Sequence, residues 1–229
     1  MQELKFLGYG AAFYPVLGNT NAFFEAEGDL FFLDFGEAAY EKVVLCFDLK
    51  KYRHIYVILT HLHADHSGSL ASLLSYAHCV LGVEVNVVHP LETVVELLKL
   101  QGISPKFYRY MPTLPDGCPV AITPYDVRHA TDMRAFGYVL SAGGEAVYYS
   151  GDAADVPEPV LSAFLAGKIA RLYQDTARNP SSSHCLYTHL EEIIPMESRP
   201  RVFCMHLDGD YEQMLKEHGF SVVQPAFKE

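Results

Sequence analysis

The sequence predicts a layered α/β fold, in which helices pack against the faces of β-sheets. Segments with the apolar, β-branched composition of strands alternate along the whole chain with segments of helical periodicity. Half of the 229 residues are hydrophobic and 20% are charged, so the chain can bury a sizeable core. The longest turn-rich stretch, MPTLPDGCP at 111–119, is too short for a domain linker, and we expect a single domain over residues 1–229.

The N-terminal half begins with a predicted hairpin, because two apolar, aromatic-rich runs flank a Gly-Asp turn at Gly28. The run HIYVIL has the apolar, β-branched composition of a buried strand. Further on, Pro90 fits the first position of a helix, where its missing N–H is not needed. The elements expected in this half are strands at Asn21–Glu25 and Leu30–Asp34, a helix at Glu37–Leu49, a strand at His54–Leu59, a helix at Ser67–Leu81, a strand at Val83–Val88 and a helix at Pro90–Leu100.

The C-terminal half continues the alternation of strands and helices. Residues 142–145, AGGE, are a turn signal between two apolar runs, and residues 177–183, ARNPSSS, form a loop that we expect to be mobile or functional. The elements expected here are strands at Val120–Arg128, Ala135–Ser141 and Ala146–Ser150, a helix at Val156–Leu165, a strand at Ile169–Gln174, a helix at Cys185–Ile194, a strand at Arg201–Met205 and a helix at Tyr211–His218.

Composition and charge narrow the classes of function. The five cysteines are odd in number and have no CxxC spacing, which favours a reduced, cytoplasmic setting over a disulfide framework. The net charge of −11 argues against an extended nucleic-acid partner, although a metal ion can supply the positive charge that a small phosphate-bearing substrate needs. Apolar runs are too short for a membrane span, and the N-terminus lacks the apolar region of a signal peptide, so we expect no membrane partner.

The stretch LTHLHADHSG at 59–68 carries three histidines and an aspartate directly after a predicted strand. His61 and His63 are two positions apart, so an extended backbone points both imidazoles to the same side. Asp65 and His66 then turn toward the next helix, for which Ser67 is the expected N-cap. Imidazoles and a carboxylate at this density suit Zn²⁺, with Mn²⁺ or Fe as alternatives, whereas a merely solvated loop would not need the H-x-H-x-D-H spacing.

Further candidate ligands follow strands elsewhere in the chain, where α/β folds place their sites. His129 and Asp152 each come after an apolar run, although a surface histidine and an ordinary Gly-Asp turn are the alternative interpretations. For the last ligand the sequence offers two histidines. His189 lies in HCLYTHLEEII, whose spacing is helical, whereas His206 directly follows the strand RVFCM, so we favour His206.

Taken in order, these motifs resemble the metallo-β-lactamase fold superfamily. THLHADH resembles its signature, and GNTNAFFEAEGDLFFLDFGE at 18–37 resembles its opening hairpin with an LDFG-like turn. The segments VRHATDMRAFGYVL, YYSGDAAD and VFCMHLDGD match later motifs in the same order, so the likeness extends from about Leu4 to Phe220. The resemblance implies a four-layer αββα sandwich, in which two packed sheets are covered by helices.

The resemblance also implies a centre for two divalent ions, of which Zn²⁺ is favoured. Carried over to this sequence, the ligands of one ion would be His61, His63 and His129, those of the other Asp65, His66 and His206, and the bridge between them Asp152. A pair of cations a few ångströms apart can activate water and hold both oxygens of an in-line displacement. A bridging carboxylate offsets the mutual repulsion of the cations.

Two segments resemble the ribonuclease Z-like and phosphodiesterase branch of the superfamily. ATDMRAFGYVL, after His129, resembles the FGY pattern of that branch and not the GHTPGS segment of β-lactamases and thioesterases. LYQDTARNPSSSH at 172–184 resembles a stretch that carries an acidic residue and a later histidine. There His184 would stand near the leaving oxygen and Asp175 would orient it or share its proton, although the usual Glu is replaced by Gln174 or displaced to Asp175. The alternative interpretation of His184 is a polar residue at the start of a helix.

We therefore interpret the chain as a metal-dependent hydrolase, most simply a phosphodiesterase for a small phosphodiester such as a cyclic nucleotide. Asp65 can act as both ligand and proton acceptor, which fits hydrolysis better than redox chemistry. Ribonuclease Z proteins commonly insert a long basic arm between the third histidine and the bridging aspartate, whereas His129 and Asp152 are only 23 positions apart. The likeness extends to compact members, which include phage-encoded cyclic-nucleotide phosphodiesterases.

Three other interpretations stay open at this point. The chain could be a tRNA 3′ processing endonuclease whose arm comes from a partner subunit, a lactonase or thioesterase of the same fold, or a non-catalytic metal-binding module. The presence of all seven candidate ligands argues against the non-catalytic module, since a site that had lost its activity would be expected to lose some of its ligands. Tyr138, Arg134 and Arg178 are further candidates for contacts with substrate. Because members of this fold often form homodimers, the resemblance also allows a homodimer.

Overall fold

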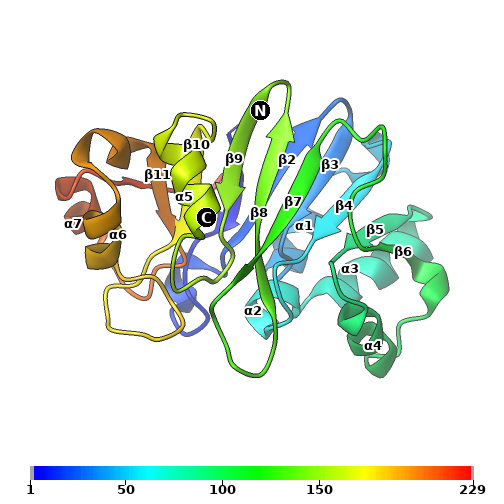
Figure 1. Ribbon diagram of the computed structural model, residues 1–229. Helices are drawn as coiled ribbons and strands as arrows, with labels where there is room; N and C mark the ends of the chain where they lie inside the picture. The colour runs from blue at the N-terminus through cyan, green and yellow to red at the C-terminus, as the bar shows by residue number, and fades with distance from the viewer. Residues whose placement is uncertain (1–2, 228–229) are drawn as a thin grey trace.

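Two sheets, stacked face to face, form the centre of the molecule (Figure 1), and the computed structural model describes residues 3–227. The first sheet is parallel from β3 to β6, and β2 and β1 extend it by antiparallel pairing. Its strands, in spatial order, are β1 (Lys5–Gly8), β2 (Asn21–Ala26), β3 (Asp29–Leu33), β4 (Ile55–Ile58), β5 (Val85–Val88) and β6 (Tyr108–Met111).

The second sheet joins an antiparallel half to a parallel half. β7, β8 and β9 pair antiparallel, and β9 to β12 pair in parallel, so β7 and β9 run in the same direction as β10 and β11. Its strands, in spatial order, are β12 (Ser221–Val222), β11 (Val202–Met205), β10 (Arg171–Asp175), β9 (Glu145–Tyr149), β8 (Ala135–Ala142) and β7 (Ala121–Val127).

Helices cover the outer face of each sheet (Figure 1), which confirms the predicted αββα sandwich. Val43 and Leu98 of two helices share a buried cluster with Phe32 of the first sheet. Phe164 of another helix shares a second cluster with Leu172 of the second sheet. The helices over the first sheet are α1 (Ala39–Cys46), α3 (Leu70–Tyr76) and α4 (Thr93–Leu100), and those over the second are α5 (Glu158–Leu165), α6 (Tyr187–Ile193) and α7 (Glu212–Glu217).

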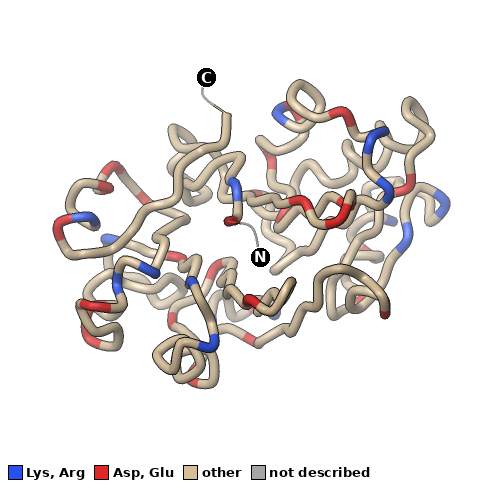
Figure 2. The backbone as a smooth tube through the Cα atoms, turned by 90° about the horizontal axis from the view of Figure 1, so that it is seen from above, with Lys and Arg blue, Asp and Glu red and all other residues tan. Residues whose placement is uncertain are grey.

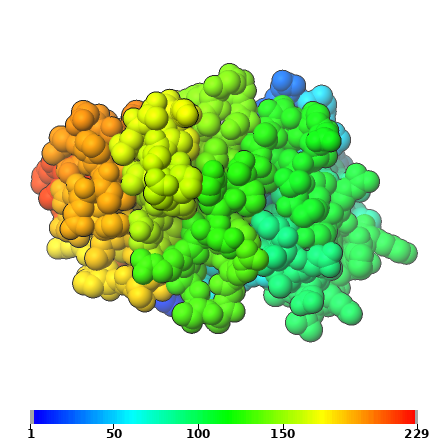
Figure 3. Space-filling model, in the orientation of Figure 1, coloured from blue at the N-terminus to red at the C-terminus, as the bar shows by residue number. Residues whose placement is uncertain are grey.

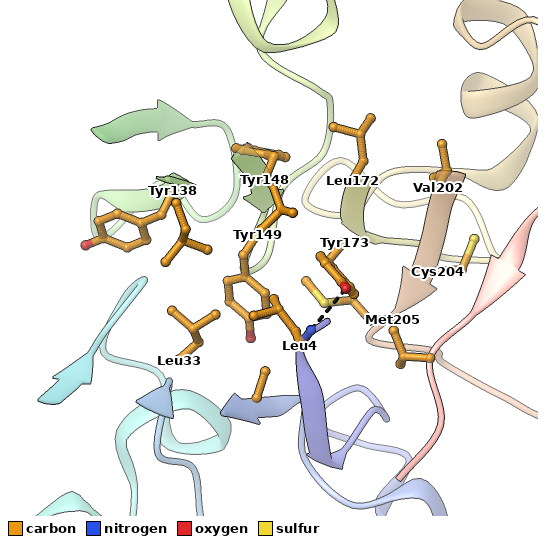
Figure 4. Close-up of a cluster of buried hydrophobic side chains, with 14 of the residues drawn as sticks. Leu4, Leu33, Tyr138, Tyr148, Tyr149, Leu172, Tyr173, Val202, Cys204 and Met205 are labelled. Atoms are coloured by element: carbon orange, nitrogen blue, oxygen red, sulfur yellow. Dashed lines mark hydrogen bonds between the residues drawn. The ribbon is translucent and has the colours of Figure 1, made fainter. Parts of the chain in front are cut away.

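Burial of both faces explains why the strands read as nearly continuous apolar runs in the sequence. In β3, Phe31 and Leu33 belong to the second cluster, which also fills the space between the sheets. Leu30 and Phe32 point to the opposite face and belong to the first cluster, under the helices. All these side chains are fully buried. Figure 4 shows Leu33 and Tyr149 pointing into the same buried layer between the two sheets. Burial of each such side chain contributes about 1.5–3 kcal/mol to stability.

The structure differs from the predictions mainly in its short elements. β1, β6 and β12 were not expected. β1 and β6 are as long as β4, which was predicted, but each includes a charged residue among its four, and β12 has only two residues. The expected helix at Ser67–Leu81 is divided into α2 (Ala64–Ser67), α3 and a π-helix at Ala77–Leu81. The division has a tertiary cause, since the hydroxyl of Ser69 donates to the carbonyl of Gly36 and accepts from the backbone N–H of Tyr40.

Two predictions about helix starts were wrong. Ser67 is not an N-cap but the last residue of α2, and its hydroxyl donates to the carbonyl oxygens of Leu62 and His63. α4 begins at Thr93 rather than at Pro90. The residues around Pro90 are held in a turn, in which the backbone nitrogen of Leu91 lies 3.2 Å from Nδ1 of His89.

No helix in residues 3–227 is long and apolar enough to span a membrane. Figure 2 shows Lys and Arg interspersed with Asp and Glu along the chain rather than gathered into one basic region. Residues 1, 2, 228 and 229, which the single-domain prediction includes, lie outside the described residues.

Phe31 tests the assignment of the central layer, because its ring stacks on Phe24 and on Tyr56, with centroids 4.8 and 4.9 Å apart. We expect Phe31→Ala to lower the free energy of unfolding by about 3–5 kcal/mol, since it leaves a cavity between the sheets. Leu100→Ala, at a position that is 87% exposed, should change it by less than about 0.5 kcal/mol. Urea unfolding followed by circular dichroism measures both, and equal effects would contradict the layer assignment.

Candidate metal centre

Strands from both sheets end at one edge of the sandwich, and polar residues follow these ends. β3 and β4 are parallel neighbours in the first sheet, and β7, β9, β10 and β11 share one direction in the second. Figure 1 shows the loops after β7 and β10, and the loop before β2, gathered along the lower edge of the molecule. This is the edge at which an α/β fold can bring side chains from distant parts of the sequence together.

The first cluster at this edge consists of three imidazoles. Nε2 of His61 lies 3.0 Å from Nδ1 of His63, which lies 3.1 Å from Nε2 of His129. Oδ2 of Asp152 faces the same point, 3.9 Å from Nε2 of His61 and 3.6 Å from Nε2 of His129. Ligand atoms placed tetrahedrally at about 2.0–2.1 Å from a zinc ion are about 3.4 Å from one another, so this spacing fits a cation.

The second cluster surrounds the other oxygen of Asp152. Oδ1 of Asp152 lies 3.0 Å from Nε2 of His66 and 3.2 Å from Nε2 of His206. Oδ2 of Asp65 lies 3.1 and 3.4 Å from the same two nitrogens. Asp152 therefore directs one carboxylate oxygen at each cluster, as a ligand shared by two cations does. The structure brings together all seven residues that the sequence nominated as ligands.

Asp34, which the sequence analysis did not nominate, orients a histidine of each cluster. Its carboxylate lies 2.8 Å from Nδ1 of His66 and accepts hydrogen bonds from the backbone and hydroxyl of Thr60. Oγ1 of Thr60 in turn lies 3.0 Å from Nδ1 of His61. Partners of this kind fix the ring orientation and tautomer of a metal-binding histidine. A signal was present in the sequence, since Asp34 follows a buried strand just as Asp152 does.

The backbone around the centre adopts conformations that constrain the sequence. Asp34 and His206 have positive φ angles of 63° and 57°, which are uncommon for residues other than glycine. A Cβ atom at Gly36 would collide with the carbonyl carbon and oxygen of Asp65, so the LDFG turn needs glycine at this close approach. Such strain persists only where surrounding contacts impose it, and it commonly marks a functional site.

The two clusters have opposite effects on histidine protonation. Burial and the neighbouring His66 lower the pKa of His61 well below its ordinary value, and burial lowers the pKa of His129. Burial would also lower the pKa of His206, but the nearby carboxylates, Asp152 foremost and then Asp175 and Asp65, together outweigh it and raise the pKa to about 10. The pKa of His66 is raised for the same reason. His61 and His129 are therefore ready to bind a cation, whereas His66 and His206 must release protons when a cation binds.

Buried polar atoms at the centre support a fit to metal ions. Within residues 3–227, Nε2 of His66, Oδ1 of Asp152 and Oδ1 of Asp175 are buried without a hydrogen bond. An unsatisfied buried polar atom costs about 1–3 kcal/mol. The first two atoms face each other at 3.0 Å in the second cluster, where one cation could bind both. Imidazole nitrogens and carboxylate oxygens are the donors that Zn²⁺ accepts, so the residues present fit the predicted ions.

Asp175 and His184, nominated as catalytic residues, both reach this centre. Nδ1 of His184 lies 2.8 Å from Oδ2 of Asp175, which also accepts a hydrogen bond from the backbone N–H of Ala153. Oδ1 of Asp175 lies 3.5 Å from Nδ1 of His206. The ring of His184 stacks on that of His206, with centroids 5.0 Å apart, and its side chain is 27% exposed. Burial would lower the pKa of His184, but Asp175 raises it above the ordinary value.

Two other nominated residues lie away from the centre. His189 is on α6, where its Nε2 lies 3.0 Å from a carboxylate oxygen of Asp155, so the choice of His206 over His189 agrees with the geometry. The prediction that Tyr138 could touch substrate was wrong. Tyr138 lies within β8, is fully buried and donates its hydroxyl hydrogen to the carbonyl of Leu59.

A cavity of about 620 Å³ opens beside the two clusters, within the size range of small-molecule sites. Arg134 does not line it and pairs with Asp126 at 2.7 Å on the surface, so a contact between Arg134 and substrate stays a prediction. Arg178 is exposed between two lining residues without lining the cavity itself. The residues that line it are Ala11, Ala12, Phe13, Tyr14, Glu37, His63, Ala64, Asp65, His129, Asp152, Ala177, Asn179, Pro180, Ser181, His184, His206 and Asp208.

The fold and the site together define a protein of the metallo-β-lactamase fold, as the sequence predicted. The metallo-β-lactamase fold protein YhfI from Bacillus subtilis is 17% identical, with a TM-score of 0.73 over 97% of this chain and 95% of that one. Human tRNase Z, short form (ELAC1), is 15% identical, with a TM-score of 0.70 over 98% and 97%. A diphosphatase from the PhnP family is 16% identical, with a TM-score of 0.72 over 98% and 95%. At these identities the likeness concerns the fold.

The particular family follows from the sequence. The family model described as Anti-Pycsar protein Apyc1 matches residues 2–224, and the chain belongs to this family. A comparison with curated proteins finds no match.

Asp34 offers a test of the centre that leaves every nominated ligand in place. We expect Asp34→Asn to weaken Zn²⁺ binding by about 10–100-fold, because an amide cannot replace the carboxylate that orients His66 and Thr60. Competition against a chromophoric chelator measures the affinity. Asp48→Asn, at an exposed position that caps a 3-10 helix, is the matched control and should bind Zn²⁺ as the parent does. Equal affinities for the two variants would argue against the role of Asp34.

Proposed function

We propose that the chain is a phosphodiesterase that uses two divalent ions, with Zn²⁺ favoured, and hydrolyses a small phosphodiester such as a cyclic nucleotide. The observation that carries the proposal is the carboxylate of Asp152, which directs one oxygen at each of two histidine clusters. When bound, such a pair of ions polarises phosphoryl oxygens and lowers the pKa of water. The residues that would hold them are His61, His63, Asp65, His66, His129, Asp152 and His206.

The chain itself supplies the proton transfers. Asp65 lines the cavity beside both clusters and accepts the proton of the attacking water. On the same cavity wall, His184 donates a proton to the departing oxygen. Oδ2 of Asp175 lies 2.8 Å from Nδ1 of His184. This carboxylate keeps the imidazole protonated and leaves its Nε2 to face the substrate. The buried carboxylate of Asp175 thus orients the proton donor in the way a second group orients a general acid.

The cavity supports a compact substrate with a single phosphodiester charge. Its described lining contains acidic Glu37 and Asp208 but neither lysine nor arginine, so no lysine or arginine on the wall would pair with additional phosphates. The chain between His129 and Asp152 consists of β8, β9 and their short connections, with no basic arm for a long nucleic acid. Membership in the Anti-Pycsar protein Apyc1 family supports a cyclic nucleotide. A cytoplasmic setting and a homodimer stay predictions from the sequence.

A panel of substrates tests the reaction class. We expect the protein loaded with Zn²⁺ or Mn²⁺ to hydrolyse 3′,5′-cyclic nucleotides and bis(p-nitrophenyl) phosphate. Asp152→Ala should reduce both activities to background while circular dichroism shows the fold largely intact. Turnover of lactones or thioesters with silence on every phosphodiester would contradict the proposal. Cleavage of precursor tRNA in preference to cyclic nucleotides would replace the small substrate by the tRNA-processing alternative.

Two substrates whose leaving groups differ in their need for a proton test the role of His184 as proton donor. We expect His184→Ala to lower kcat for cyclic nucleotides by about 10²–10⁴-fold, because an alkoxide leaves poorly without a proton. The loss should be much smaller for bis(p-nitrophenyl) phosphate, whose p-nitrophenolate departs without protonation. His189→Ala, outside the cavity, is the control histidine and should leave both rates unchanged. Equal losses of His184→Ala on the two substrates, or a loss of bound metal, would argue for a structural role instead.

A further inference from the structure

Residues 11–17, here called the rim loop, form part of the cavity wall. Ala11, Ala12, Phe13 and Tyr14 line the same cavity as the candidate metal ligands. Phe13 is 99% exposed, so a large aromatic side chain stands in solvent at the mouth of a polar site. In the space-filling view of Figure 3, the blue N-terminal surface meets the gold surface of the residues after β10 at the lower edge. The metal centre and an open aromatic ring thus share one cavity.

Backbone hydrogen bonds fix the base of the rim loop beside the second cluster. The N–H of Ala11 donates to the carbonyl of Leu207, the residue after His206, at 2.9 Å. The N–H of Gly10 donates to the carbonyl of Gly18 at 2.7 Å and closes the loop across its base. The aromatic tip is therefore held at a defined place relative to the metal centre, although its ring has no packing contact that would explain its presence there.

We infer that Phe13 is a stacking platform for the base of a nucleotide whose phosphodiester lies at the metal centre. This inference rests on the proposed phosphodiesterase function and names a group that selects among its substrates. A base covers an exposed ring without needing a charged partner, and the described cavity wall offers no lysine or arginine. Every base has a π-face, so the platform selects nucleotides over phosphodiesters that lack a base and tolerates both purines and pyrimidines.

Other lining residues agree with a base at this end of the cavity. Asn179, Pro180 and Ser181 also line it and have uncharged side chains. The amide of Asn179 is anchored by Asp208, whose Oδ2 accepts a hydrogen bond from Nδ2 at 2.9 Å. The uncharged polar side chains of Asn179 and Ser181 suit the edge of a base, and an aromatic ring suits its face.

The kinetics of substrates with and without a nucleobase test whether Phe13 is a stacking platform. We expect Phe13→Ala to raise KM for 3′,5′-cyclic AMP and 3′,5′-cyclic CMP by about 5- to 150-fold, the range that base–aromatic stacking provides. The kcat should change little, because the stack is equally strong in the ground state and the transition state. Hydrolysis of trimethylene phosphate, a six-membered cyclic phosphodiester without a base, should be unaffected and can be followed by phosphorus NMR.

Two further variants separate stacking from general effects on the loop. Val16→Ala removes a second exposed apolar side chain of the rim loop, which is 78% exposed and does not line the cavity, and it should leave KM unchanged. Phe13→Leu keeps apolar bulk without a ring and should behave like Phe13→Ala. Phe13→Tyr keeps the ring and should behave like the parent protein.

The absence of tryptophan from the sequence provides a readout besides activity. F13W gives the protein a single indole at the proposed platform, and V16W gives one at the control position. In stopped-flow mixing before turnover, we expect cyclic AMP to change the indole fluorescence of F13W and trimethylene phosphate to leave it unchanged. V16W should respond to neither compound.

The outcomes distinguish failure of the platform from failure of the proposed function. Wild-type protein that hydrolyses no phosphodiester overturns both. Wild-type protein that hydrolyses cyclic nucleotides with an unchanged KM in Phe13→Ala overturns the platform alone, as does an equal rise in KM for trimethylene phosphate. A change in molecular mass of Phe13→Ala in light scattering would assign the ring to a contact between copies of the chain and would also overturn the platform.

Discussion

One buried carboxylate, that of Asp152, is shared between two groups of histidines, and the rest of the site is arranged around it. Asp152 is only 3% exposed, and a charge in such a place is tolerated only when it is paired. Its oxygens face His66 at 3.0 Å on one side and His129 at 3.6 Å on the other. These residues follow strands in different sheets, so the two sheets must pack in one register for the pairing to exist. Side chains of both sheets, such as Leu33 and Tyr149, share the buried cluster between the sheets, and their packing holds that register.

Two carboxylates that are not among the seven candidate ligands, those of Asp34 and Asp175, hold the histidines of this arrangement in place. Asp34 reaches His66 directly and His61 through Thr60, and Asp175 reaches both His184 and His206. Asp34, directly after β3, thus holds the segment that follows β4, and Asp175 of β10 holds His206, which follows β11. Positive φ angles at Asp34 and His206 indicate that the backbone accepts local strain to place these side chains.

Much of this arrangement could be predicted from the sequence, because its main signals are local. A run such as HIYVIL followed by THLHADH reveals both a buried strand and the polar loop at its end. The strands β1, β6 and β12 gave no such signal, because β1 and β6 each include a charged residue and β12 has only two residues. The break between α2 and α3 and the burial of Tyr138 also depend on distant partners, Gly36 and Leu59. Asp34 was missed because a lone aspartate after a strand does not reveal which histidine it will meet.

The central claim is that Asp152 lies between two cations, and anomalous diffraction from crystals of the zinc-loaded protein tests it most directly. Data collected on either side of the zinc absorption edge locate each ion without reference to activity. The account predicts two peaks about 3.5–4 Å apart, one on each side of the Asp152 carboxylate. A single peak, or peaks away from the two histidine clusters, would contradict it.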